Sequence, residues 1–148
     1  MSGARRSGPP EPPRVSILSE GPYLLASVHT ALDDDQLLRF QHDLVERIRN
    51  DRAKGVIIDV GAMDVVDSFS SRTLRNLASM AQLRGANTVI VGISPELAVT
   101  MVHLGLALDP VHTALDLDEG LACLDQLSHR HWSPRLRARA GQARASRP

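Results

Sequence analysis

The most informative part of this chain is Val65-Val66-Asp67-Ser68-Phe69-Ser70-Ser71. It follows a strand-like apolar run at residues 55–60 and opens into a helix-like run at residues 72–84. A serine between a strand and a helix is typical of an N-cap, whose hydroxyl accepts from backbone N–H groups that the helix leaves unpaired. The same place favours a phosphate, because the free N–H groups and the helix dipole attract anions. Ser68 is therefore predicted to be either a cap alone or a phosphorylation switch.

Outward from this stretch, strand-like and helix-like runs alternate along the chain. The first two strands, at residues 15–18 and 23–28, are separated by the turn residues Gly21-Pro22 and are expected to form a hairpin. Further strands are predicted at residues 55–60, 88–91 and 111–114, with helices starting near residue 33 and at residues 72–84, 95–105 and 116–127. The order β-β-α-β-α-β-α-β-α predicts an α/β fold in which helices cover a sheet.

Apolar spacing identifies the expected buried face of each helix. Leu37, Phe40, Leu44, Val45 and Ile48 supply the first, and the residues Leu74, Leu77, Ala78, Ala81 and Leu83 supply the second. The third helix is expected to run through Leu97, Val99, Met101 and Val102 to Gly105, and the last helix presents Leu117, Leu121, Leu124 and Leu127 as its buried face. The lone cysteine, Cys123, follows the last apolar pattern and is predicted to be a buried core residue.

Length and composition indicate one globular domain with an aliphatic core. The chain has 148 residues, of which 43% are hydrophobic and only 3% aromatic. It carries no apolar run near 18 residues and no apolar segment typical of a secretory signal at its N-terminus, so a cytoplasmic location is expected.

The net charge of zero conceals an uneven distribution. Residues 129–148 carry six Arg and no acid, whereas residues 15–128 carry 8 basic and 16 acidic side chains, a difference of −8. We predict a proline-rich, disordered arm at residues 1–13, a folded domain at 14–128 and an Arg-rich, disordered tail at 129–148. The tail is also compatible with contact to RNA, an anionic surface or another subunit. The acidic domain is not expected to bind nucleic acid, but suits a basic patch on a protein partner.

Enzyme signatures are not found in the sequence. Phosphate-binding glycine loops and nucleophile motifs do not occur, and the six histidines lack metal-ligand spacing. The adjacent acids Asp33, Asp34 and Asp35 lack the alternate spacing of a calcium loop and are better explained as the start of a helix. We predict no catalytic residue, no metal and no cofactor.

An ordered set of short matches runs through residues 14–127. It includes Leu32-Asp33-Asp34, Gly55-Val56-Ile57-Ile58-Asp59, Val66-Asp67-Ser68-Phe69, Leu83-Arg84-Gly85-Ala86, Val91-Gly92-Ile93 and Thr113-Ala114-Leu115-Asp116-Leu117. This set resembles the STAS domains of bacterial anti-sigma-factor antagonists, above all the stressosome members of that family. The resemblance implies a SpoIIAA-like fold, with a central mixed sheet and about four helices packed on it.

The resemblance also implies a phosphorylation site. The residue that follows the acid at the start of the second helix, here Ser68, is the one that a partner kinase modifies in such antagonists. Ser70, Ser71 and Thr100 are weaker candidates for the same modification. Asp64, Asp67, Ser68 and Phe69 are the residues expected to contact the partner.

A stressosome role follows from the resemblance as an expectation. The protein would assemble with itself and with RsbR-type STAS paralogues, sequester an RsbT-type serine kinase, and release it when Ser68 is phosphorylated. A PP2C-type phosphatase would reset the switch, and the output would be the general stress response. Two alternatives stay open: a monomeric antagonist that binds an anti-sigma kinase directly, and a ligand-binding or nucleotide-binding STAS domain.

Overall fold

The computed structural model describes residues 14–63, 67–103 and 111–128. The predicted order of elements is confirmed, with a helix at residues 117–128, here called the last helix, after the fifth strand. The predicted arm at 1–13 and tail at 129–148 lie outside the described residues. The remaining bounds are β1 Val15–Glu20, β2 Tyr23–Val28, α1 Asp34–Asp51, β3 Gly55–Asp59, α2 Ser68–Leu83, β4 Asn87–Val91, α3 Pro95–His103 and β5 His112–Ala114.

The five strands form one mixed sheet in the order β1-β2-β3-β4-β5. β1 and β2 pair antiparallel as the predicted hairpin, from Val15 opposite Val28 to Glu20 opposite Tyr23. The three remaining pairs are parallel, so β2, β3, β4 and β5 end at the same edge of the sheet. Parallel neighbours on both sides explain why β3 reads as a continuous apolar run.

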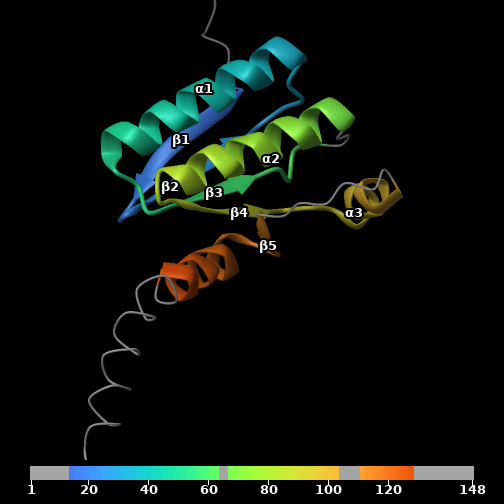
Figure 1. Cartoon of the computed structure of the whole chain (residues 1–148). Helices are drawn as coiled ribbons and strands as arrows, with labels where there is room; N and C mark the ends of the chain where they lie inside the picture. The colour runs from blue at the N-terminus through green and yellow to red at the C-terminus, as the bar shows by residue number, and fades with distance from the viewer. Residues whose placement is uncertain (1–13, 64–66, 104–110, 129–148) are drawn as a thin grey trace, which may run out of the picture.

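Helices cover both faces of the sheet (Figure 1). α1 and α2 lie on one face, and the last helix lies on the other. Successive strand residues point to opposite faces, so Val56 and Ile58 join the core under α1 and α2, whereas Ile57 joins the core under the last helix. The sheet thus separates a larger core cluster from a smaller one.

The larger core confirms most of the predicted helix faces. The predicted residues that are buried in α1 and α2 are Leu37, Phe40, Leu44, Ile48, Leu74, Leu77, Ala78 and Ala81. Val45 is only half-buried, and Leu83 is 87% exposed, so the prediction for Leu83 was wrong. Leu83 is the last residue of α2 and lies two residues, or about 200° of helical rotation, beyond the buried Ala81, so it faces solvent.

The last helix approaches the sheet closely because a glycine on each side leaves room for the other: Gly120 in the helix and Gly55 in β3. A β-carbon on Gly120 would lie 3.0 Å from Val91 Cγ1, and one on Gly55 would lie 2.7 Å from Leu124 Cδ2. The Tyr23 hydroxyl also donates to Asp125 Oδ1 at 2.5 Å, which joins β2 to this helix across 102 residues of sequence. Cys123 is half-buried and packs against this smaller core, so the prediction of a buried core residue is confirmed only in part.

α3 lies beyond the carboxyl ends of β3 and β4. It begins at Pro95, as predicted, and buries Leu97 and Met101 against the larger core. Val99 and Val102 lie on the same helix but are 56% and 76% exposed. None of the helices formed by the described residues is both long enough and apolar enough to span a membrane.

Candidate functional site

The candidate site lies where the chain leaves β3 and enters α2. Asp59, the last residue of β3, accepts a hydrogen bond from the backbone N–H of Gly61 through Oδ1 at 2.9 Å. The N–H of Val60 donates to the carbonyl of Val91 at 3.0 Å, and the N–H of Met63 donates to that of Val60 at 2.9 Å. These bonds anchor the first part of the loop to the end of β4.

Asp67, and not Ser68, is the N-cap of α2. Its backbone is extended, with φ −92° and ψ −177°, and its Oδ1 accepts from the N–H of Ser70 at 2.7 Å. The prediction that Ser68 caps the helix was therefore wrong. The carboxylate one residue earlier already satisfies the unpaired N–H group, which makes Ser68 the first residue of the helix.

The cap also fixes the charge of Asp67. The hydrogen bond from the Ser70 N–H, together with one from the Ser70 hydroxyl, lowers the pKa of the Asp67 carboxyl below its usual value of 3.8. The side chain is exposed and ionised at neutral pH. A negative charge therefore stands directly before Ser68.

The four candidate hydroxyls differ in their access to a partner. Ser68 is exposed, whereas Ser70 and Ser71 are only 7% and 3% exposed. Thr100 is exposed on α3, but its hydroxyl donates to the Glu96 carbonyl of the preceding turn at 3.0 Å. A kinase reaches the Ser68 hydroxyl without unfolding the helix, but it does not reach those of Ser70 and Ser71 in this way.

The predicted partner-contact residues divide into three kinds. Asp67 and Ser68 are exposed at the start of α2, and Phe69 is half-buried and packs against the larger core. Asp64 lies outside the described residues. Phe69 thus anchors the first turn of α2 and leaves Asp67 and Ser68 as the accessible part of the predicted set.

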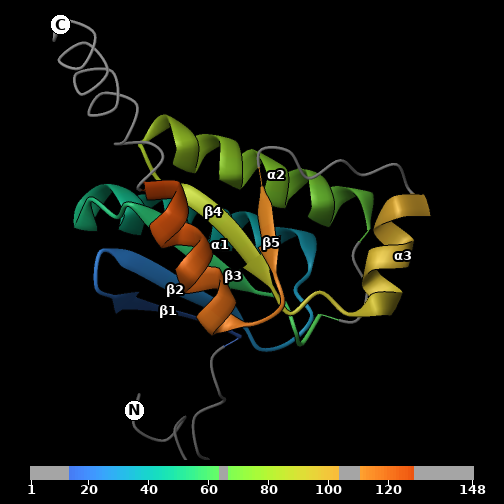
Figure 2. The ribbon, with the colours of Figure 1, turned by 90° about the horizontal axis from the view of Figure 1, so that it is seen from below.

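Sequence reasoning missed a second exposed surface at the same end of the molecule. The start of α2 and the whole of α3 lie side by side at the carboxyl edge of the sheet (Figure 2). The exposed Val99 and Val102 of α3 add apolar area there. Spacing offered a signal, because Leu97 and Met101 are four residues apart and define one face, which Val99 does not share.

The fold and this site together define a class of protein. A family model described as "STAS domain" matches residues 21–120, and the chain belongs to the STAS domain family. The predicted STAS fold, a mixed sheet with four helices, is confirmed.

Within this family the chain is similar to RsbS. A structure of an RsbS variant from Moorella thermoacetica is 35% identical, with a TM-score of 0.69 over 79% of this chain and 99% of that chain. A chain from the structure of the stressosome, described as a signal integration and transduction hub, is 33% identical, with a TM-score of 0.61 over 76% of this chain and 98% of that chain. The predicted relationship to stressosome antagonists is thereby confirmed.

The RsbT co-antagonist protein RsbRA of Bacillus subtilis strain 168 is 28% identical over 99 residues. That match covers 67% of this chain but only 36% of RsbRA, so the chain spans about a third of this relative's length.

Proposed function

We propose that this protein is a stressosome component that holds an RsbT-type serine kinase and releases it when Ser68 is phosphorylated. The observation that carries the proposal is the accessibility of Ser68 at the first position of α2, next to the buried Ser70 and Ser71. The similarity to RsbS over 99% of that chain supports the same assignment.

The helix tolerates a phosphate at this position. A phosphoserine carries roughly two negative charges at neutral pH, and the N-terminal end of a helix favours negative charge. Ser68 makes no side-chain hydrogen bond with any described residue, so modification breaks none of the bonds that hold the first turn. The domain is expected to stay folded, and the change is confined to its surface.

The same phosphate would weaken the binding of a partner that covers this surface. It would stand beside the ionised Asp67, and a bound kinase would have to desolvate both groups. The exposed Val99 and Val102 supply apolar contact area next to this charge. Contact with the kinase is thus expected to be favourable before phosphorylation and unfavourable after it.

In this proposal the protein is a substrate and a ligand, and not a catalyst. It would act in the cytoplasm, assemble with itself and with RsbR-type paralogues, and be reset by a PP2C-type phosphatase. The relatives in the stressosome structure and among the RsbT co-antagonists support co-assembly. The acidic domain, with its net charge of −8 over residues 15–128, suits a basic kinase surface.

A phosphorylation assay with the host's RsbT-type kinase and ATP tests the switch. Intact mass and peptide mapping are expected to give one phosphate on Ser68, none on Ser68→Ala, and unchanged modification on the exposed control Thr100→Ala. Kinase binding measured by calorimetry is expected to be lost in Ser68→Glu and kept in Ser68→Ala. Phosphate on Thr100 or Ser70, or equal kinase binding by Ser68→Glu and wild type, would overturn the proposal.

Assembly size separates the stressosome reading from a monomeric antagonist. Analytical ultracentrifugation of the protein mixed with its RsbR-type paralogue is expected to give a particle of many subunits. A monomer that still binds and releases the kinase through Ser68 would instead support direct antagonism of an anti-sigma kinase.

A further inference from the structure

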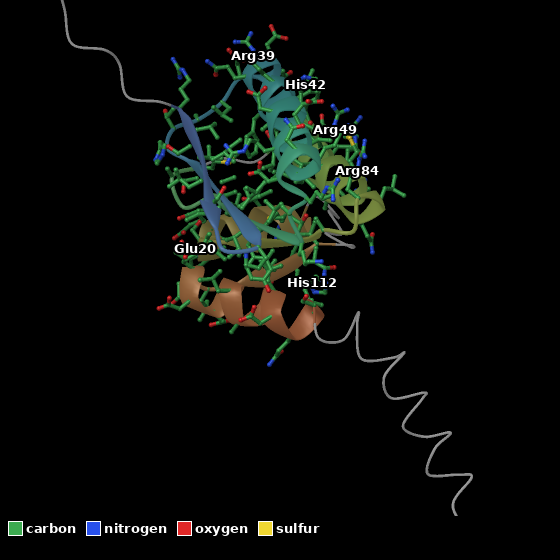
Figure 3. The ribbon with its side chains drawn as sticks, turned by 90° about the vertical axis from the view of Figure 1, so that its left-hand side faces the viewer. Glu20, Arg39, His42, Arg49, Arg84 and His112 are labelled. Carbon is green, nitrogen blue, oxygen red and sulfur yellow. The ribbon has the colours of Figure 1, made fainter. Side chains whose placement is uncertain are left out.

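A groove of about 340 Å³ lies between β1 and the first turns of α1, and neither Asp67 nor Ser68 is among the residues that line it. We call it the β1–α1 groove. Its apolar part consists of Val15, Ile17, Leu32 and Phe40, and its polar part consists of Arg14, Gln36, Arg39 and Asp43. The four α1 residues are spaced i, i+3, i+4 and i+7, so one stripe of the helix forms one wall. Figure 3 looks onto this side of the molecule, with Arg39 on α1 at the end where β1 begins.

The floor of the groove is apolar and built into the core. Phe40 is 3% exposed, and Val15, Ile17 and Leu32 are half-buried and pack against the larger core cluster. Such a floor holds a hydrocarbon or aromatic body by excluding water from it.

The rim carries two cations that the fold does not use. Within residues 14–63, 67–103 and 111–128, no side-chain hydrogen bond or ion pair involves the guanidinium of Arg14 or that of Arg39. Arg47, further along α1, is different. It donates to Asp51 Oδ2 at 3.3 Å and to the Ile17 carbonyl at 3.3 Å. Arg49, outside the groove, also has no side-chain partner among the described residues, so what distinguishes Arg14 and Arg39 is their place on the rim of an apolar groove.

The remaining polar groups of the groove favour an anion as well. Gln36 is fixed by the capping box of α1, since its Oε1 accepts from the N–H of Asp33 at 2.9 Å. This bond leaves the amide NH2 of Gln36 as a donor, with no partner among the described residues. Asp43 is the one carboxylate of the lining, and it is four residues from Arg39 without forming an ion pair with it.

We propose that the β1–α1 groove binds a small organic anion with an apolar body, such as a medium-chain carboxylate. The ligand's carboxylate would accept from Arg39 and Arg14, and its apolar chain would lie on Phe40, Ile17 and Leu32. Two arginines and one aspartate give the lining of the groove a net charge of +1, on a domain whose residues 15–128 carry a net charge of −8. Charge complementarity therefore selects an anion over a cation or a neutral apolar molecule.

Titration of the full ¹⁵N-labelled chain with sodium octanoate, followed by amide NMR shifts, tests the proposal. Saturable shifts are expected at residues 14–17 and 36–43, with much weaker binding of the uncharged 1-octanol. Shifts that do not saturate, that centre on α3 and β5, or that octanol reproduces at the same concentration would overturn it.

Two variants at exposed groove positions are expected to change binding in opposite directions, and a third variant is a control; all three are at exposed positions and are expected to leave the fold intact. Arg39→Gln is expected to weaken octanoate binding about 5- to 10-fold, since it removes a charge-assisted hydrogen bond in a partly exposed site. Asp43→Asn is expected to tighten it about 2- to 5-fold, because it removes the repulsive carboxylate. Arg49→Gln, an exposed arginine of the same helix outside the groove (Figure 3), is the control and is expected to change nothing. Equal effects of Arg39→Gln and Arg49→Gln would mean that the groove does not select the anion.

Discussion

The Oδ1 atom of Asp59 lies 2.8 Å from the position that a β-carbon on Gly92 would occupy. Gly92 follows β4 with a φ of +83°, and Asp59 ends the neighbouring strand β3. The same carboxylate oxygen holds the N–H of Gly61 at 2.9 Å. The loop that leads to α2 and Ser68 is thus shaped by a close approach that only a glycine at position 92 allows.

Gly92→Ala is therefore expected to destabilise the domain by about 2–3 kcal/mol, since it adds a steric clash to an unfavourable backbone conformation. Gly85→Ala is the matched control, because Gly85 has a similar φ of +82° but nothing within 4 Å of its added β-carbon. Gly85→Ala is expected to lower the free energy of unfolding by only about 1 kcal/mol. Urea unfolding of both variants checks the difference, and equal losses would show that the contact with Asp59 contributes nothing.

The cap at the start of α2 predicts that two adjacent residues have different roles. Asp67 contributes to stability, and Ser68 contributes to signalling. Asp67→Ala is expected to cost about 1 kcal/mol, as loss of an N-cap does, because the N–H of Ser70 then has no acceptor. Ser68→Ala is expected to change stability by less than about 0.5 kcal/mol, since Ser68 is an exposed first-turn residue. Thermal and urea unfolding measure both. A larger loss for Ser68→Ala than for Asp67→Ala would return the capping role to Ser68.

Local chemistry explains why the sequence predicted the elements well and the cap poorly. Apolar periodicity found β3, the hairpin of β1 and β2, and the buried stripe of α1, because burial on one face dictates those patterns. Asp67 and Ser68 are both good N-cap residues, and only the backbone conformation decides between them. Spacing within α3 already separates Val99 from the face of Leu97 and Met101, but the exposure of Val102 depends on how much of α3 the sheet edge covers. Pairing of Tyr23 with Asp125 likewise depends on tertiary packing.

The buried hydroxyl of Ser71 predicts that replacing this serine by alanine does not lower the stability of the fold. Ser71 Oγ has no hydrogen-bond partner in the structure of the described residues, and the side chain is 3% exposed. Ser71→Ala removes an unpaired polar group, and the alanine side chain is nearly the same size as that of serine. The variant is therefore expected to be neutral or to stabilise the fold by up to about 1 kcal/mol.

Thr73→Val is the comparison for this prediction, because the Thr73 hydroxyl donates to the Phe69 carbonyl at 2.8 Å and its loss removes a bond. Urea unfolding of both variants is the measurement, and the midpoint of Ser71→Ala is expected to lie above that of Thr73→Val. A clear loss of stability in Ser71→Ala would mean that its hydroxyl does have a partner in solution.

The single tyrosine offers a direct test of how the last helix is held. Burial, and then the hydrogen bond to Asp125 and its negative charge, raise the pKa of Tyr23 from 10.0 to about 12. Since the chain has one tyrosine, the ultraviolet absorbance of tyrosinate reports this titration alone. Asp125→Asn is expected to lower the pKa of Tyr23 towards 10, because it removes the charge while keeping an acceptor.

The raised pKa of Tyr23 has a defined consequence for stability. The folded state binds the phenol proton more tightly than the unfolded state, so this contribution is fully present below pH 10 and is lost as pH rises to 12. Tyr23→Phe is expected to cost about 1 kcal/mol at neutral pH, through loss of the bond to Asp125, and to remove most of the stability change between pH 10 and 12. The two proteins differ only at position 23, so subtracting the two unfolding curves isolates the contribution of Tyr23. Parallel curves for wild type and Tyr23→Phe over this range would mean that the hydroxyl does not hold the last helix to the sheet.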